Sequence, residues 1–437
     1  MLGYYLGMAL HSLARNKVLT ALMVLAIGLG IGASMTMITV LHVLTDDPLP
    51  GRSSQLFTPH LDPLPLNHKQ GGDNPDPADN FTWPDAMALL KAQRAARQAA
   101  MAGGTLLVRP ASAGLRPFKV DGRYATADFF AMFGVPFEHG QGWSAADDAA
   151  RAHVVVLSGT LDRKLFGNAS GIGQAVRLGD HDFRVIGVTA DWQPKSMFYA
   201  DPGAQHYSDA DQFFLPLPVA VDLKLSINGH QSSWGKNDDS NNLTGATMTW
   251  LQFWVQLDSP AQVQAYRQFL VDYSAQQRAL GRFERPPTDA KLYSLMGWLT
   301  HENLVPNDVR LQLWLALGFL FVCMVNIAAL LLSKFLRRSG EISVRRALGA
   351  RRRDIFLQLG IESALIGVAG GVLGLVIAQI GLWSVRHRPD DYAQMAQMDM
   401  PMLLGTLALA IVASVLAGLL PAWRACRVPP ALQLKTL

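Results

Sequence analysis

Arginine side chains between residues 345 and 353 give this sequence its clearest potential for specific chemistry. The five are Arg345, Arg346, Arg351, Arg352 and Arg353. A guanidinium group forms paired hydrogen bonds with carboxylates and phosphates, which suits contact with an acidic protein surface or with lipid headgroups. Apolar residues recur around them at near-helical spacing: Ile342, Ala347, Leu348, Ile355, Phe356 and Leu359. The pattern predicts short helices that lie along a membrane surface and offer a docking site.

Patterns for catalysis or metal binding are missing from the sequence. It contains no GxxxxGK[ST], HExxH or GxSxG pattern. The glycine-rich stretch Gly167–Gly173 leads into a strand-like run and favours a turn, and Ser158 fits a helix N-cap better than a nucleophile. The histidines of the polar middle have no ligand spacing: His60, His68, His139, His153, His181, His206 and His230. We therefore expect no catalysis, no metal site and no cofactor in this chain.

The composition is divided between apolar ends and a polar middle. Hydrophobic residues make up 50% and charged residues 16%, too apolar for an ordinary soluble chain and too polar for one that lies wholly in a membrane. The formal net charge is +4 and is concentrated beside the apolar runs, which favours a topology signal over nucleic-acid binding. Cys323 and Cys426 lie in or next to those runs, so no disulfide framework is expected.

Four apolar runs are each long enough to cross the ~30 Å hydrocarbon core once. They are Val18–Leu44, Val309–Leu332, Ile361–Val385 and Met402–Trp423. The first run is too long for the apolar core of a cleaved signal peptide and lacks a small-residue cleavage site, so a permanent anchor is the better interpretation.

Positive charge beside the spans predicts the topology. Arg15 and Lys17 precede the first span, and basic residues follow the second and fourth, which places both termini and the arginine-rich segment in the cytoplasm. The predicted order is an amphipathic helix and first span (1–45), a large outer domain (46–308), the second span (309–333), a cytoplasmic segment (334–360), the third span (361–385), a short outer loop (386–401), the fourth span (402–424) and a cytoplasmic tail (425–437).

The outer domain contains both alternating and helical patterns, which predict a large mixed α/β fold with two lobes. This domain is inserted between the first and second of four transmembrane helices. Strands are expected at Thr105–Val108, His153–Leu157, Phe183–Val188 and Met248–Leu257. Helices are expected at Ala127–Phe133, Thr160–Phe166 and Ala261–Leu280.

Small and polar residues inside the spans point to close helix packing. The glycines Gly28, Gly30, Gly32, Gly367, Gly370, Gly371 and Gly374 let backbones approach, either within one chain or across a dimer. Glu362 is expected at the membrane interface or against a partner, and Asn326 in an interhelical hydrogen bond. No line of charged residues crosses the bilayer, which argues against a polar translocation path between the helices.

The segment Glu341–Gly374 (EISVRRALGARRRDIFLQLGIESALIGVAGGVLG) closely resembles the signature of MacB/FtsX-type ABC transporter permeases. The closing stretch Gly418–Leu432 (GLLPAWRACRVPPAL) is similar to the last element of that family, and Leu10–Gly32 fits its first span. Asp128–Gly142 and Leu165–Val188 resemble its periplasmic core domain. Two departures exist: Ser170-Gly171 stands where a Pro-Ile-Gly turn is usual, and residues 190–247 match no pattern.

The resemblance implies a dimeric permease in a bacterial inner membrane, with its large domain in the periplasm. ATP and Mg²⁺ would be bound by a separate ABC ATPase subunit, and movement would pass through the spans to the periplasmic domains without substrate passing between the helices. Further partners of such permeases are a second permease copy or a related permease, a periplasmic adaptor and an outer-membrane channel. The residues implied in ATPase coupling are Glu341, Ser343, Arg345, Arg346, Ala347, Leu348, Gly349, Ala350, Arg351, Arg352 and Arg353.

Two other functions stay open at this point. One is a membrane scaffold or sensor that activates a periplasmic partner, as similar cell-division permeases do. The other is a membrane-anchored periplasmic enzyme, which the missing catalytic pattern disfavours. The substrate of an exporter is not indicated by any residue.

Overall fold

A computed structural model describes two compact units. Unit 1 comprises Met1–Thr45 with Val305–Leu437, and unit 2 comprises Asp46–Leu304. The described residues are 7–9, 11–13, 16–66, 78–110, 115–167, 169–194, 196–200, 210–234, 242–302, 307–338, 340, 344–345, 348–349, 351–387, 398 and 400–427.

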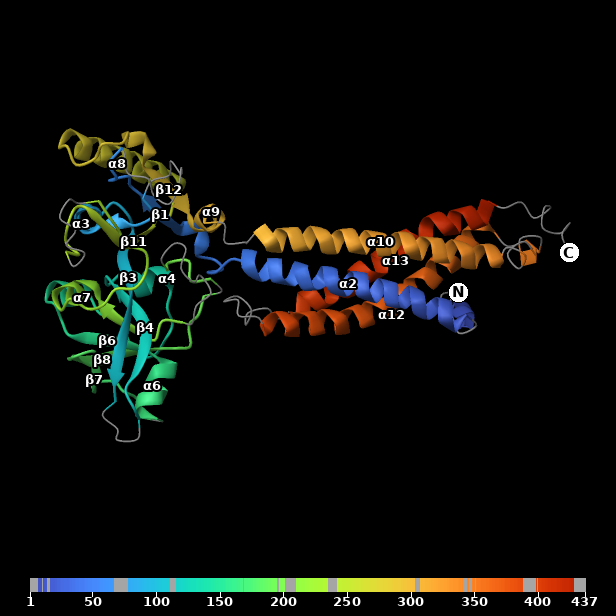
Figure 1. Ribbon diagram of the computed structural model, residues 1–437, viewed down its shortest axis with the longest axis horizontal. Helices are drawn as coiled ribbons and strands as arrows, with labels where there is room; N and C mark the ends of the chain where they lie inside the picture. Colours follow the sequence, from blue (N-terminus) through green and yellow to red (C-terminus); the bar gives the residue numbers. More distant parts are fainter. Residues whose placement is uncertain are drawn as a thin grey trace. The chain divides into compact units, whose positions relative to one another are not determined.

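Unit 1 is built from four long helices, α2 (Lys17–Thr45), α10 (Asn307–Arg337), α12 (Arg352–Arg386) and α13 (Met400–Arg427) (Figure 1). Each is long and apolar enough to cross a membrane. Helix α2 packs against α10 and α12, and α13 packs against the same two helices. The four spans predicted from hydropathy are therefore confirmed.

Helix α12 differs from the prediction at its start. It begins at Arg352 and runs unbroken into the span, whereas short surface helices were expected up to Ile361. Ile355 and Leu359 are buried in the core of unit 1, so the interpretation of these residues as a surface helix was wrong. Their helical spacing continues to Glu362 and Ile366, so one buried stripe runs along the whole helix and nothing ends it before the span.

Unit 2 is organised around one twelve-stranded sheet. Along its main path the strand order is β12-β1-β11-β3-β4-β9-β6-β8-β5, while β2 and β10 pair with β11, and β7 pairs with β3 and β8. The strands are β1 (Leu56–His60), β2 (Phe81–Thr82), β3 (Arg97–Arg109), β4 (Phe118–Ala125), β5 (Phe137–Gly140), β6 (Val154–Ser158), β7 (Ala175–Leu178), β8 (His181–Thr189), β9 (Phe213–Pro216), β10 (Ser232–Ser233), β11 (Met248–Gln256) and β12 (Lys291–Ser294). Most neighbours are antiparallel, but β4 with β9 and β6 with β8 are parallel.

Helices connect these strands. They are α3 (Trp83–Ala92), α4 (Phe129–Phe133), α5 (Ala145–Ala149), α6 (Gly159–Phe166), α7 (Leu217–Asp222), α8 (Pro260–Ala279) and α9 (Leu295–His301), with short 3₁₀ turns at Ser53–Gln55 and Pro287–Asp289. Four strands and three helices were expected from the sequence, and each has a counterpart here. The combination of four membrane helices with an α/β domain between the first and second confirms the predicted fold class.

Two hydrophobic clusters use opposite faces of the sheet. Alternate residues of β6 divide between them, with Val155 in one cluster and Val156 in the other. In β9, Phe213 and Phe214 divide in the same way, as the two-residue period of a strand requires. The structure gives Asp46–Leu304 as one compact unit with a layer of core on each face of the sheet. The division into two lobes stays a prediction.

Candidate functional site

Val344 and Leu348 of the arginine-rich segment are joined by a backbone hydrogen bond of the helical type. The amide of Leu348 donates to the carbonyl oxygen of Val344, with N and O 3.0 Å apart. Gly349 then has a φ of +102°, a conformation that residues with a side chain rarely adopt, and it ends the turn. Arg351 has extended backbone angles and is the N-cap of α12. The segment therefore leads directly into a membrane helix.

Two apolar side chains of this turn are open to solvent. Leu348 is 83% exposed and Val344 is 49% exposed, the former among the highest values for a large hydrophobic side chain in the described chain. The arginines Arg351, Arg352 and Arg353 beside them are exposed as well. An apolar pair bordered by cations is suited to a partner that offers a hydrophobic groove with an acidic border.

Arg345 attaches this turn to α12. Its Nη1 donates to Oε1 of Gln358 over 3.2 Å. The turn is thus held both by the chain connection through Arg351 and by a side-chain contact about two turns into α12. Five residues of the predicted coupling set lie outside the described residues: Glu341, Ser343, Arg346, Ala347 and Ala350.

Glu362 lies in a buried ionic cluster rather than against lipid. Its Oε1 forms an ion pair with Nζ of Lys334 and accepts a hydrogen bond from Oγ of Ser12 over 2.6 Å. Nη1 of Arg338 lies 3.5 Å from Oε2 of Glu362. The sequence located the unusual carboxylate, but its partners lie on α10 and the N-terminal segment, and helical spacing along α12 gives no sign of them.

The predicted glycines pack within the chain. A Cβ on Gly28 or Gly32 would meet Leu373 or Ile377 of α12, and one on Gly370 or Gly374 would meet Ile27 or Ile31 of α2. Gly367 and Gly371 face Ala410 of α13 in the same manner. The small residues thus bring α2, α12 and α13 into close contact.

Asn326 occupies an exposed position on α10. Its side chain forms no hydrogen bond with another described residue, so the expected interhelical bond is not formed between the described helices.

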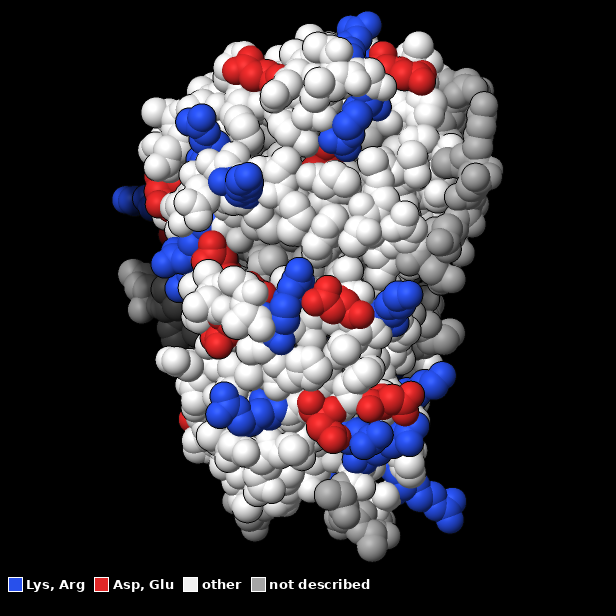
Figure 2. Space-filling view, turned by 90° about the vertical axis from the view of Figure 1, so that its left-hand side faces the viewer, with Lys and Arg blue, Asp and Glu red and all other residues white. Residues whose placement is uncertain are grey.

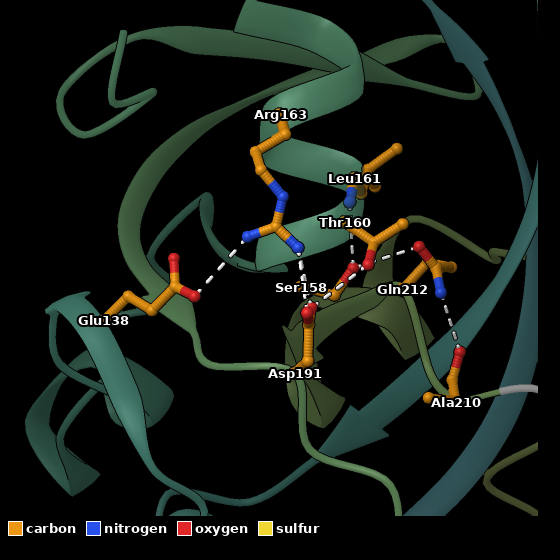
Figure 3. A network of polar contacts seen from close by, with 8 residues as sticks. All are labelled: Glu138, Ser158, Thr160, Leu161, Arg163, Asp191, Ala210 and Gln212. Carbon is orange, nitrogen blue, oxygen red and sulfur yellow. Dashed lines mark hydrogen bonds and ion pairs between the residues drawn. The ribbon is translucent and has the colours of Figure 1, made fainter. Parts of the chain in front are cut away.

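A polar network of unit 2 lies around the N-terminus of α6 (Figure 3). Nη2 of Arg163 donates to both carboxylate oxygens of Asp191, over 2.9 and 3.0 Å, and Thr160 donates to the same carboxylate over 3.1 Å. Ser158 accepts a hydrogen bond from the amide of Leu161, which confirms its predicted role as the N-cap. The network holds the N-terminus of α6 to Asp191 and, through Ser158, to Gln212.

A second network, which the sequence did not indicate, is buried and joins β4 to residues of the unmatched region 190–247. Arg123 of β4 pairs with Asp211, Nε to Oδ2 2.9 Å, and both side chains are 6% exposed. The hydroxyl of Tyr199 donates to the same Asp211 oxygen over 3.2 Å, and the Arg123 guanidinium lies over the Tyr199 ring. Burial raises the pKa of Tyr199, so its hydroxyl stays protonated and donates.

Metal-binding clusters and the distribution of surface charge bear on two further kinds of function. Among the described residues no group of three or more His, Cys, Asp or Glu side chains could hold a metal ion. On the face in Figure 2, basic and acidic side chains are interspersed, unlike the one-sided field of a nucleic-acid binder.

Two family models cover most of the chain. The MacB-like periplasmic core domain matches residues 20–272, more than half of the sequence, and the FtsX-like permease C-terminal model matches residues 314–430.

Curated relatives align along nearly the whole chain. The pyoverdine export ATP-binding/permease protein PvdT of Pseudomonas entomophila is 26% identical, covering 95% of this chain and 57% of that protein. The macrolide export ATP-binding/permease protein MacB of Escherichia coli O6:K15:H31 is 25% identical, and the alignment covers 97% of this chain and 59% of that protein. The chain thus spans less than two thirds of the length of these relatives.

Among solved structures, the periplasmic region of MacB from Actinobacillus actinomycetemcomitans is similar over 60% of this chain and 98% of its own, with 15% identity and a TM-score of 0.38. Four apolar helices together with the periplasmic-domain family indicate a multi-pass protein of the inner membrane. With one family model on the polar domain and another on the C-terminal spans, the chain belongs to the MacB/FtsX-type ABC transporter permeases.

Proposed function

We propose that this chain couples ATP hydrolysis, performed by a separate ABC ATPase subunit that binds ATP and Mg²⁺, to rearrangement of its periplasmic domain, and so drives export across the cell envelope. The relatives named above join ATP-binding and permease functions in one protein, and this sequence contains no GxxxxGK[ST] motif. In this proposal both termini and the segment around Leu348 face the cytoplasm, where the ATPase works.

The observation that carries the proposal is the exposed Val344–Leu348 turn at the end of a spanning helix. The two apolar side chains would enter a groove of the ATPase, and Arg351–Arg353 would contact acidic residues beside it. Because α12 is one helix from Arg352 to Arg386, a displacement of the turn moves the whole membrane-crossing element.

The packing of unit 1 supports movement of helices rather than passage of substrate between them. Gly28 and Gly32 hold α2 against α12, while Gly367 and Gly371 hold α13 against α12. Lys334 and Glu362 are paired with each other, so their charges do not line an open path. Export would then take place at the periplasmic domain, with an adaptor and an outer-membrane channel as candidate partners.

Leu348→Asp tests the proposal. In proteoliposomes that contain the ATPase, we expect the substitution to abolish permease-stimulated ATP hydrolysis, because a carboxylate cannot replace a leucine in an apolar groove. Leu280→Asp is the matched control, since Leu280 is 67% exposed and lies in unit 2. Equal stimulation by wild type and Leu348→Asp would refute the assigned docking site.

A further inference from the structure

Glu362 joins three parts of unit 1 that are far apart in the sequence. Lys334 comes from the last turns of α10, Arg338 follows that helix, and Ser12 belongs to the N-terminal segment. Nη1 of Arg338 also donates to Oγ of Ser12, which in turn donates to Glu362. The end of α10 is thus tied to the third turn of α12 and to the segment that precedes α2.

Burial makes this cluster costly to break. The side chains of Lys334 and Glu362 are each 1% exposed. A charge withdrawn from water is stable only while its partner remains, and removing one partner leaves an uncompensated buried charge. A pair of well-packed apolar side chains could hold two helices together at no greater cost, so stability alone does not explain why ionic groups occupy this position. Directional hydrogen bonds have a different effect, since they set the register of one helix against another.

The residue after Glu362 extends the same joint to the fourth helix. Oγ of Ser414, on α13, donates to the carbonyl oxygen of Ser363, and both serine side chains are buried. A Cβ on Gly418 would collide with Oγ of Ser363, so α13 comes close to α12 at this level. Glu362 and Ser363 together therefore contact α10, α13 and the segment that precedes α2.

We propose that the cluster of Ser12, Lys334, Arg338 and Glu362 is a positioning site. It makes the cytoplasmic ends of the helices move as one body when the ATPase displaces the Val344–Leu348 turn. The inference rests on the function proposed above and adds to it the groups that pass the displacement from α12 to α10 and the N-terminal segment. Glu362 acts through the other helices and touches neither nucleotide nor substrate.

Glu362→Gln tests this role in the full chain reconstituted with its ATPase. The amide keeps the shape of the side chain and removes the charge that Lys334 and Arg338 share. We expect unchanged ATPase binding in a pull-down, an unchanged KM for ATP, and a loss of stimulated kcat of about tenfold, within the usual range of coupling between two sites. Glu362→Asp, which retains the carboxylate, should recover part of the stimulation.

A second variant covers the case in which Glu362→Gln fails to fold. The double substitution Lys334→Met with Glu362→Met removes both charges of the pair, so neither is left buried without its partner, and thermal stability should be preserved. We expect this folded double variant to remain poorly stimulated, because apolar contact does not set the helix register. Full stimulation by the double variant or by Glu362→Gln would overturn the inference. The function proposed above fails on a different result, namely normal ATPase binding and stimulation by Leu348→Asp.

Discussion

Gly32 of α2 lies against the backbone of α12 near Gly374. A Cβ on Gly32 would be 2.6 Å from Cγ2 of Ile377 and 3.1 Å from the carbonyl oxygen of Gly374. At that distance even one methyl group must push the helices apart, so the contact depends on the absence of a side chain.

Gly32→Ala should therefore destabilise unit 1. Overpacking of a close contact costs about 1–3 kcal/mol, more than the gain in helix propensity from replacing glycine. Gly318→Ala on α10 is the matched control, since nothing lies within 4 Å of its added Cβ. Thermal unfolding in detergent should show a lower midpoint for Gly32→Ala only, and equal midpoints for the two variants would contradict the close packing.

The buried pair of Arg123 and Asp211 gives a prediction for unit 2. Asp211→Leu leaves the Arg123 guanidinium buried without its carboxylate, which should cost about 3–5 kcal/mol. The double substitution Arg123→Met with Asp211→Leu removes both charges and should regain most of that loss. Denaturant unfolding followed by tryptophan fluorescence measures both. A double variant no more stable than the single one would show that the pair does not act as a unit.

Asp148 makes the stability of unit 2 depend on pH. Burial raises the pKa of its carboxyl from the usual value of 3.8 to about 6. Between pH 3.8 and about 6 the folded chain holds more protons than the unfolded chain. The stabilisation that the protonated Asp148 gives to the folded state is therefore complete below about pH 4 and is lost as the pH rises through 6.

Asp148→Asn should flatten the pH dependence of the unfolding midpoint between about pH 4 and 7. The neighbouring Asp147→Asn is the control, because a hydrogen bond from the backbone of Ser144 lowers the pKa of Asp147 and confines its effect to lower pH. An unchanged slope in Asp148→Asn would assign the dependence to another group.

Topology can be tested with reporters at two positions. We expect a green fluorescent protein fused after Leu437 to fluoresce, since it folds in the cytoplasm, and alkaline phosphatase inserted after Gly281 to be active, since it needs the periplasm. Exchanging the reporters should silence both. Any other pattern would contradict the orientation deduced from Arg15, Lys17 and the later basic residues.

Hydropathy was enough to predict the four spans, because a membrane helix requires a long apolar run whatever it packs against. The start of α12 was missed, since Ile355 and Leu359 fit either a surface helix or a longer buried one, and only packing against the other helices decides between them. In unit 2 the long apolar strand β11 was evident. Strand β9 was not, because Phe213–Pro216 is short and its neighbours β4 and β6 are distant in the sequence.

The candidate site shows the same limit. The arginines and Leu348 were found from local pattern alone. By contrast, the contact of Arg345 with Gln358 and that of Glu362 with Lys334 depend on how the helices are rotated and placed. Periodicity within one segment carries no information about either pair.

Hydrogen exchange in the domain formed by Asp46–Leu304 measures the central claim most directly, namely that ATP turnover at the cytoplasmic side rearranges this domain through the Leu348 turn. It would be recorded in membranes containing the ATPase, with and without ATP. We predict that ATP changes exchange in this domain of the wild type and of Leu280→Asp, and leaves it unchanged in Leu348→Asp. An ATP-dependent change of equal size in Leu348→Asp would contradict the account.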